Sequence, residues 1–157
     1  MIPESLAQAT GIARGFGFAR MGVGAMGTDT RLAIYDDLRE QYLPTVCDYI
    51  ATLYARVLPV DDHERILLVS VHQAMWSHGF GLDFLSASKC RKTLLRLALA
   101  KGFSHEHIDR IDALVLDELM EIVAMRYRRS PSAVVAYNRA ILAVVTETVG
   151  FETLKAA

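Results

Sequence analysis

The pattern of apolar and polar positions is helical from Thr30 onward. Val46, Ile50, Leu53 and Val57 follow one another at intervals of four, three and four residues, which places one apolar stripe along a single helix face. No segment alternates apolar and polar residues for long enough to indicate a strand. The sequence therefore predicts an all-α domain.

Helix start and stop signals divide this pattern into six helices joined by short connections. Pro44 is expected to break the first helix, because its ring disfavours helical conformation at the preceding residue. Asp61 with Glu64 has the spacing of a capping box, and Gly102 suits the position after a helix end. The expected helices cover residues 30–42, 44–58, 61–79, 83 or 86 to 102, 104–129 and 130–150.

The first 29 residues differ from the rest because they are crowded with glycine. Gly22, Gly24 and Gly27 formally match the dinucleotide fingerprint GxGxxG. That fingerprint requires a preceding buried strand and a second strand that ends in an acidic residue, and only the following helix is present here. We expect residues 1–29 to form a glycine-rich N-terminal arm, followed by one domain over residues 30–157.

Composition and charge exclude several classes of protein. The net charge of -1 gives no overall attraction to nucleic acid or anionic lipid. Cys47 and Cys90 lack CxxC spacing, which argues against a disulfide framework or a zinc site and suits the reducing cytosol. The start of the chain lacks a signal-peptide pattern, and no apolar run is long enough to span a membrane. We expect a cytoplasmic protein without membrane or nucleic-acid partners.

Three local segments resemble one family. They are "LREQYLPTVCDYIATLYARVL", which contains Tyr54; "HQAMWSHGFGLDFL", with Trp76, Phe80 and Gly81; and "LALAKGFSHEHIDRIDALVLDEL", with Lys101, Gly102, Phe103 and Glu106. With them, the chain from about Leu38 to Val149 resembles the sensor globins, which include protoglobins and bacterial globin-coupled sensors. The resemblance implies a globin-like helical bundle whose ligand pocket is faced by Tyr54, His72, Trp76 and Leu99.

The resemblance fails at the haem iron. In this family the proximal histidine precedes the glycine by a few residues, and the corresponding positions here are Ala98 and Leu99. An alkyl side chain has no lone pair for a metal, and the neighbouring Arg96 and Lys101 stay protonated at neutral pH. The resemblance therefore implies a sensor globin without haem or any other cofactor. The alternative is a haem-binding oxygen sensor that uses a non-standard ligand such as His72.

The histidines do not form a zinc motif. No two of the five are four residues apart, and His72 and His78 point about 120° from one another on a straight helix. His72 shares a helix face with Leu68, Val69 and Trp76, so it points towards apolar surroundings. It is either a core or boundary histidine bonded to a carbonyl, or a pocket residue that contacts haem or a small ligand.

Signals for catalysis are weak. The acidic residues Asp109, Asp112, Asp117, Glu118 and Glu121 lack the ExxH segments of dinuclear carboxylate sites. Neither cysteine has an adjacent histidine, and no GxSxG motif is present. We expect no enzyme. The basic segment "SKCRKTLLR" (Lys89, Arg91, Lys92, Arg96) is either an exposed helix face or a patch that binds an anion or a partner.

The last helix carries apolar residues around more than half of its circumference, more than one core contact requires. We expect a homodimer through the last two helices, with Val134, Ile141, Leu142 and Val145 at the interface. The leading prediction is a sensory input domain that signals through this dimer to an output protein or domain. The alternatives are the haem-binding gas sensor and a module whose only role is dimerisation.

Overall fold

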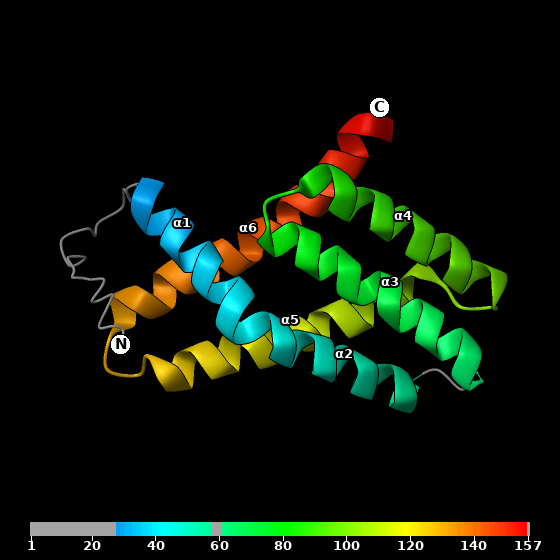
Figure 1. The fold of residues 1–157 in the computed structure, drawn as a ribbon, viewed down its shortest axis with the longest axis horizontal. Coiled ribbons are helices and arrows are strands. Elements are labelled where there is room, and N and C mark those ends of the chain that lie inside the picture. Colours follow the sequence, from blue (N-terminus) through cyan, green and yellow to red (C-terminus); the bar gives the residue numbers. More distant parts are fainter. Residues whose placement is uncertain (1–27, 58–60, 157) are drawn as a thin grey trace.

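The computed structural model describes residues 28–57 and 61–156. Positions 1–27 of the predicted glycine-rich arm, which include the GVGAMG segment, lie outside the described residues. The described elements are α1 (Thr28–Asp37), the π-helical turn η3 (Leu38–Tyr42), α2 (Leu43–Val57), α3 (Asp62–Phe80), α4 (Phe84–Ala100), α5 (His105–Arg126) and α6 (Pro131–Ala156). No strand occurs in the described ranges, so the prediction of an all-α protein is confirmed (Figure 1).

The predicted break at Pro44 is wrong. Asp37 and Leu43, on either side of η3, both have right-handed helical dihedral angles, so α1, η3 and α2 form one continuous helical run. The Leu43 N–H bonds to the carbonyl of Leu38, five residues back instead of four. A proline inside an α-helix lacks the N–H that its own turn needs and crowds the preceding turn. The wider turn directly before Pro44 accommodates the ring without stopping the helix.

α3 and α4 pack closely side by side as a helical hairpin (Figure 1). Asp61 caps α3 by accepting a hydrogen bond from the Glu64 N–H at 2.9 Å, as the capping-box spacing predicts. The reversal between the two helices contains Leu82 at a positive φ of 62°, and Asp83 caps α4. This hairpin sets residues from the second half of α3 beside the first half of α4.

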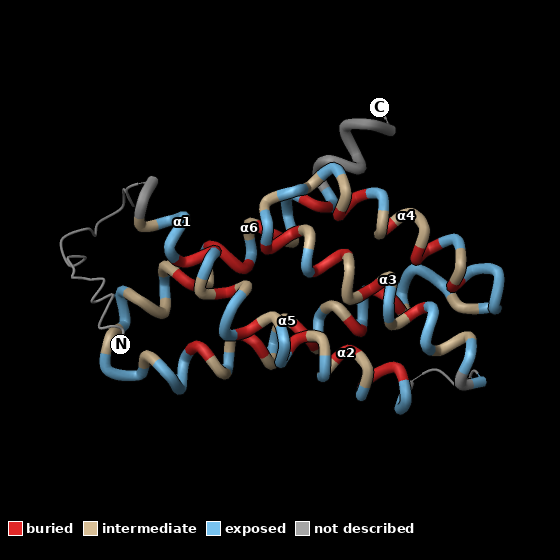
Figure 2. The backbone as a smooth tube through the Cα atoms, viewed as in Figure 1, coloured by how far each residue is buried: buried red, intermediate tan, exposed pale blue. Residues whose placement is uncertain are grey.

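α5 and α6 complete the core. α5 packs against α2, α4 and α6, while α6 crosses the bundle and contacts α1, α3, α4 and α5. Buried positions lie on the sides of the helices that face one another (Figure 2). Among the described residues, no helix combines the length and the apolar character that a membrane span needs.

α3 and α6 approach each other very closely at Gly79. A Cβ atom at this position would lie only 2.7 Å from Cγ1 of Val144 and 3.7 Å from Oγ1 of Thr148. Real Cβ atoms do not approach other atoms at 2.7 Å, so only glycine lets α6 sit this close. The contact brings α6 against the end of α3 that carries Trp76.

Candidate functional site: a buried polar network

Three helices bring Tyr54, His72 and Asp112 together in the interior. The hydroxyl oxygen of Tyr54 on α2 lies 2.7 Å from Nδ1 of His72 on α3. The other ring nitrogen of His72, Nε2, lies 2.6 Å from Oδ1 of Asp112 on α5. Tyr54 and His72 are both fully buried. A buried polar side chain costs free energy unless it is hydrogen-bonded, and here both nitrogens of the buried ring have a partner.

The Asp112 carboxylate sets the direction of the hydrogen bonds that it receives. An ionised carboxylate only accepts, so His72 donates its Nε2–H to Asp112, and the Trp76 Nε1–H donates to the same oxygen at 3.0 Å. When Nε2 carries the only ring proton, Nδ1 accepts a hydrogen bond from the Tyr54 hydroxyl. Burial, and secondly the charge of Asp112, raise the pKa of Tyr54 above its usual 10.0, which keeps the phenol a neutral donor.

Arg91 of α4 connects the network to the surface. Its Nη1 lies 3.6 Å from Oδ2 of Asp112, and its Nη2 donates to Oδ1 of Asp109 at 3.0 Å. The side chain of Arg91 is 11% exposed and that of Asp112 is 16% exposed, whereas that of Asp109 is 57% exposed. The guanidinium therefore balances the inner carboxylate, which a buried charge requires, and the chain of contacts continues to solvent at Asp109.

Helical spacing explains why these side chains meet. His72 and Trp76 are four residues apart on α3, and Asp109 and Asp112 are three apart on α5, so each helix directs two network members from one face. Arg91 lies on the same face of α4 as the buried Leu94. Four helices thus contribute to one contiguous set of polar contacts.

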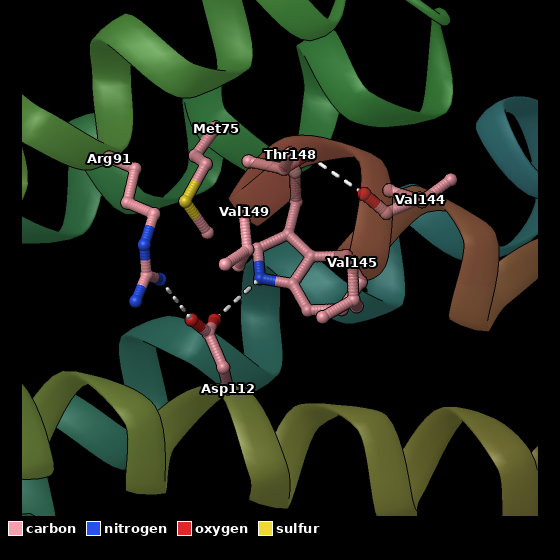
Figure 3. Close-up of a pocket in the computed structure, with 8 residues that line it drawn as sticks. Met75, Arg91, Asp112, Val144, Val145, Thr148 and Val149 are labelled. Atoms are coloured by element: carbon pink, nitrogen blue, oxygen red, sulfur yellow. Dashed lines mark hydrogen bonds and ion pairs between the residues drawn. The ribbon is translucent and has the colours of Figure 1, made fainter. Parts of the chain in front are cut away.

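A small hollow separates this network from α6 (Figure 3). Its volume is about 20 Å³, enough for roughly one water molecule and far below the ~300 Å³ at which small-molecule sites begin. The residues that line it are Met75, Trp76, Arg91, Asp112, Val144, Val145, Thr148 and Val149. The last four belong to α6, so the network and α6 face each other across one shared space.

Three of the four pocket residues expected from the sequence, Tyr54, His72 and Trp76, lie together in this network. Leu99 does not: 68% of it is exposed at the end of α4, so its assignment to an interior pocket is wrong. Ala98, only 1% exposed, occupies the inward face one position earlier. A helix rotates by about 100° per residue, which turns the next side chain outward.

Some of the residues expected at a dimer interface are buried in the core, and others are exposed. Ile141 is fully buried in the core, so its assignment to the interface is wrong, and Val134 and Val145 pack partly against the same core. Leu142 is 43% exposed. Two further apolar residues of α6 are exposed at seven-residue intervals from it: Val135 at 49% and Val149 at 39%. These three residues are called the α6 stripe below.

The arrangement of His72 does not fit an axial haem ligand. An iron ligand needs a ring nitrogen with a free lone pair, and both nitrogens of His72 are already engaged, by Tyr54 and Asp112. The adjoining hollow also has far less volume than a porphyrin requires. In the described part of the chain, no group of three or more histidine, cysteine or carboxylate side chains is placed to hold a metal ion.

Sequence reasoning missed the two charged members of the network. Asp112 was considered only as one of several possible metal-binding carboxylates, and Arg91 only as part of an exposed helix face or of a patch that binds an anion or a partner. The available signal was periodicity: Arg91 follows Ala87 by four residues and precedes Leu94 and Ala98, all buried on the inward face of α4. Comparison of the chain with family models, with curated proteins and with solved structures gives no match.

Proposed function

We propose that this chain is a non-enzymatic regulatory input domain of the sensor-globin type, which works without haem and signals through association of two copies. One observation carries the proposal. Val149 lines the hollow beside Trp76 and Asp112, and it also belongs to the α6 stripe. A single residue of α6 therefore touches both the space next to the buried network and the surface through which a second copy could bind.

Stability alone does not account for the network. Replacing a buried ion pair by well-packed apolar residues is often neutral or stabilising, so a bundle gains little stability from burying His72, Asp112 and Arg91. Such groups do supply orientation and the capacity to switch, because a change in protonation or hydration alters which hydrogen bonds are made. This fits a domain that responds to a signal better than one that only holds a shape.

The route from the network to α6 is short. A change at Asp112 alters the hydrogen bond to Trp76 and the ion pair to Arg91, and both of these residues line the hollow against α6. The close contact of Gly79 with Val144 leaves α6 little space to absorb such a shift locally. The displacement passes instead to the outer side of α6, where the output is read through the dimer.

The α6 stripe supports association between copies. Val135, Leu142 and Val149 are exposed at seven-residue intervals, so they fill one position of the heptad repeat along which two helices pack. The same surface on both copies gives a closed, two-fold dimer, the commonest form of oligomer. The resemblance of the sequence to sensor globins supports the same reading of the last helices.

Sedimentation velocity at micromolar concentration tests the proposed association. We expect the wild-type protein to sediment as a dimer and Leu142→Glu as a monomer. Leu32→Glu is the matched control, because Leu32 of α1 is similarly exposed at 48% but lies outside the α6 stripe. A wild-type monomer, or a dimer that persists in Leu142→Glu, contradicts the proposed interface.

The absence of haem is tested by absorption spectroscopy. The purified protein, titrated with haem, is expected to give no Soret band beyond that of free haem, and His72→Ala is expected to behave in the same way. A Soret band that appears in the wild type and is lost in His72→Ala supports the gas-sensor alternative instead.

A further inference from the structure

The outward face of α4 is basic in a chain that is slightly acidic overall. α4 contains Lys89, Arg91, Lys92 and Arg96 and no acidic residue, although the chain as a whole has a net charge of -1. Arg91 turns inward to Asp112 and Asp109. The other three cations remain on the outer side of the helix, so the positive charge there is local and is not a consequence of composition.

These cations form one stripe with a leucine at each end. Leu85, Lys89, Lys92, Arg96 and Leu99 follow at intervals of four, three, four and three residues, which is one face of an α-helix. Leu85 is 41% exposed and Leu99 is 68% exposed. At 1.5 Å per residue the face is about 21 Å long. We call these five residues the α4 face.

The described part of the protein offsets this charge only in part: the pKa of the Asp83 carboxyl is lowered mainly by its hydrogen bonds to Ser86 and, to a smaller extent, by the charges of His78 and Lys89. Within residues 28–57 and 61–156, Lys89, Lys92 and Arg96 form no ion pair, and their one side-chain hydrogen bond runs from Arg96 to its neighbour Thr93, at 3.4 Å. By contrast, Lys101 at the end of α4 is paired with Glu64 at 2.5 Å. Three like charges along one helix face repel one another, which favours an external partner of opposite charge.

The spacing indicates the shape of that partner. Alternating steps of four and three residues are the seam along which two helices pack, with apolar side chains normally at every seam position. Here only the two ends, Leu85 and Leu99, are apolar and the middle is cationic. We propose that the α4 face docks an acidic amphipathic helix of a partner protein, with carboxylates opposite the three cations and an apolar residue opposite each leucine.

Other occupants fit less well. A membrane-bound helix buries a continuous apolar face and keeps its cations at the margins, whereas the α4 face has its cations in the centre. The chain's own first 27 residues contain Arg14 and Arg20 against a single acid, Glu4, so they do not complement a basic surface. The inference goes beyond the proposed function, because it needs neither the buried network nor the α6 dimer.

A synthetic helical peptide tests the proposal. It carries Leu, Glu, Glu, Glu and Leu at the same intervals, and its binding to the full chain is followed by fluorescence anisotropy. The double variant Lys89→Glu/Lys92→Glu, and separately Lys89→Gln/Lys92→Gln, should weaken binding at least about tenfold, and salt should weaken it in the wild type. The control Arg128→Glu/Arg129→Glu makes the same change in charge at exposed positions after α5 and should bind normally.

Further variants and a membrane control identify what binds the α4 face. Leu85→Ala/Leu99→Ala should also weaken peptide binding, and the monomeric Leu142→Glu should retain it, which separates this inference from the proposed dimer. Equal binding by the Lys89/Lys92 variants and the control overturns the proposal. So does tighter binding to phosphatidylglycerol vesicles than to the peptide, which makes the occupant a membrane. If the Lys89/Lys92 variants lose the self-association that the wild type shows, the proposal is overturned as well, because the occupant is then a second copy of the chain.

Discussion

The Nε2 atom of His72 lies 2.6 Å from Oδ1 of Asp112, a residue forty positions further along the chain. The Tyr54 hydroxyl holds the opposite nitrogen at 2.7 Å. The position and orientation of a fully buried imidazole are thereby fixed by side chains from two other helices. Because Asp112 also binds Trp76 and Arg91, its carboxylate joins α3, α4 and α5, and His72 links it to Tyr54 on α2.

Removing this carboxylate should destabilise the fold strongly. Asp112→Ala leaves the buried N–H donors of His72 and Trp76 without a partner and removes one of the carboxylates beside Arg91, at a cost of about 3–5 kcal/mol. Urea unfolding followed by circular dichroism measures the change. Asp109→Ala removes the exposed partner of Arg91 and should cost less than about 1 kcal/mol. Similar losses of unfolding free energy in both variants would contradict a larger stabilising role for the buried contacts of Asp112.

The close approach of α3 and α6 predicts an asymmetry between two glycines. In Gly79→Ala the new methyl group clashes with Val144 at a cost of about 1–3 kcal/mol, against the ~1 kcal/mol that alanine gains over glycine in a helix, so we expect a net loss of up to about 2 kcal/mol. At Gly81 a Cβ atom comes no nearer than 3.4 Å to another atom, so Gly81→Ala should be nearly neutral in the same unfolding experiment.

A second substitution checks the cause of the Gly79 effect. Val144→Ala removes the atom that the new methyl group strikes, so the double variant Gly79→Ala/Val144→Ala should be more stable than the sum of the two single changes indicates. Strict additivity contradicts a direct clash between α3 and α6.

Alkaline conditions should unfold the protein because several tyrosines are buried. Burial raises the pKa values of Tyr42, Tyr54 and Tyr137 above the usual 10.0. Above pH 10 these phenols ionise in the unfolded chain but stay protonated in the folded one, so the unfolded chain binds fewer protons and stability falls as pH rises. Below that pH their contribution is fully present.

The urea midpoint between about pH 9 and about pH 11.5 measures this loss. Absorbance at the tyrosinate band should rise together with unfolding for these three residues, and Tyr137→Phe should flatten the dependence on pH. Ionisation of all six tyrosines while the helices remain intact contradicts the assigned burial.

The sequence was sufficient for the helices and their order. Apolar periodicity and local signals such as the Asp61–Glu64 cap depend on residues close together in the chain, so they can be read directly. The continuity of the helix through Pro44 could not be read in this way. A π-helical turn has no sequence pattern that marks it, and here it lies directly before Pro44, between α1 and α2.

The candidate site was predictable only in part. Tyr54, His72 and Trp76 stand out because a polar or aromatic residue on an apolar face needs a partner, and all three belong to the network. Their partner Asp112 lies on a helix with five other acidic residues, and sequence alone does not show which of these turns inward. That choice depends on how α5 rotates against α3 and α4, which is a property of the packed structure.

Control of the α6 association by the buried network is tested most directly by the dimer dissociation constant. Sedimentation equilibrium should compare the wild type with Asp112→Asn, which keeps the size of the side chain but removes its charge, and with the exposed control Asp109→Asn. We predict a shift of about tenfold for Asp112→Asn, or about 1.4 kcal/mol of coupling, and none for Asp109→Asn. Equal dissociation constants in all three proteins contradict the account and leave a module that only dimerises.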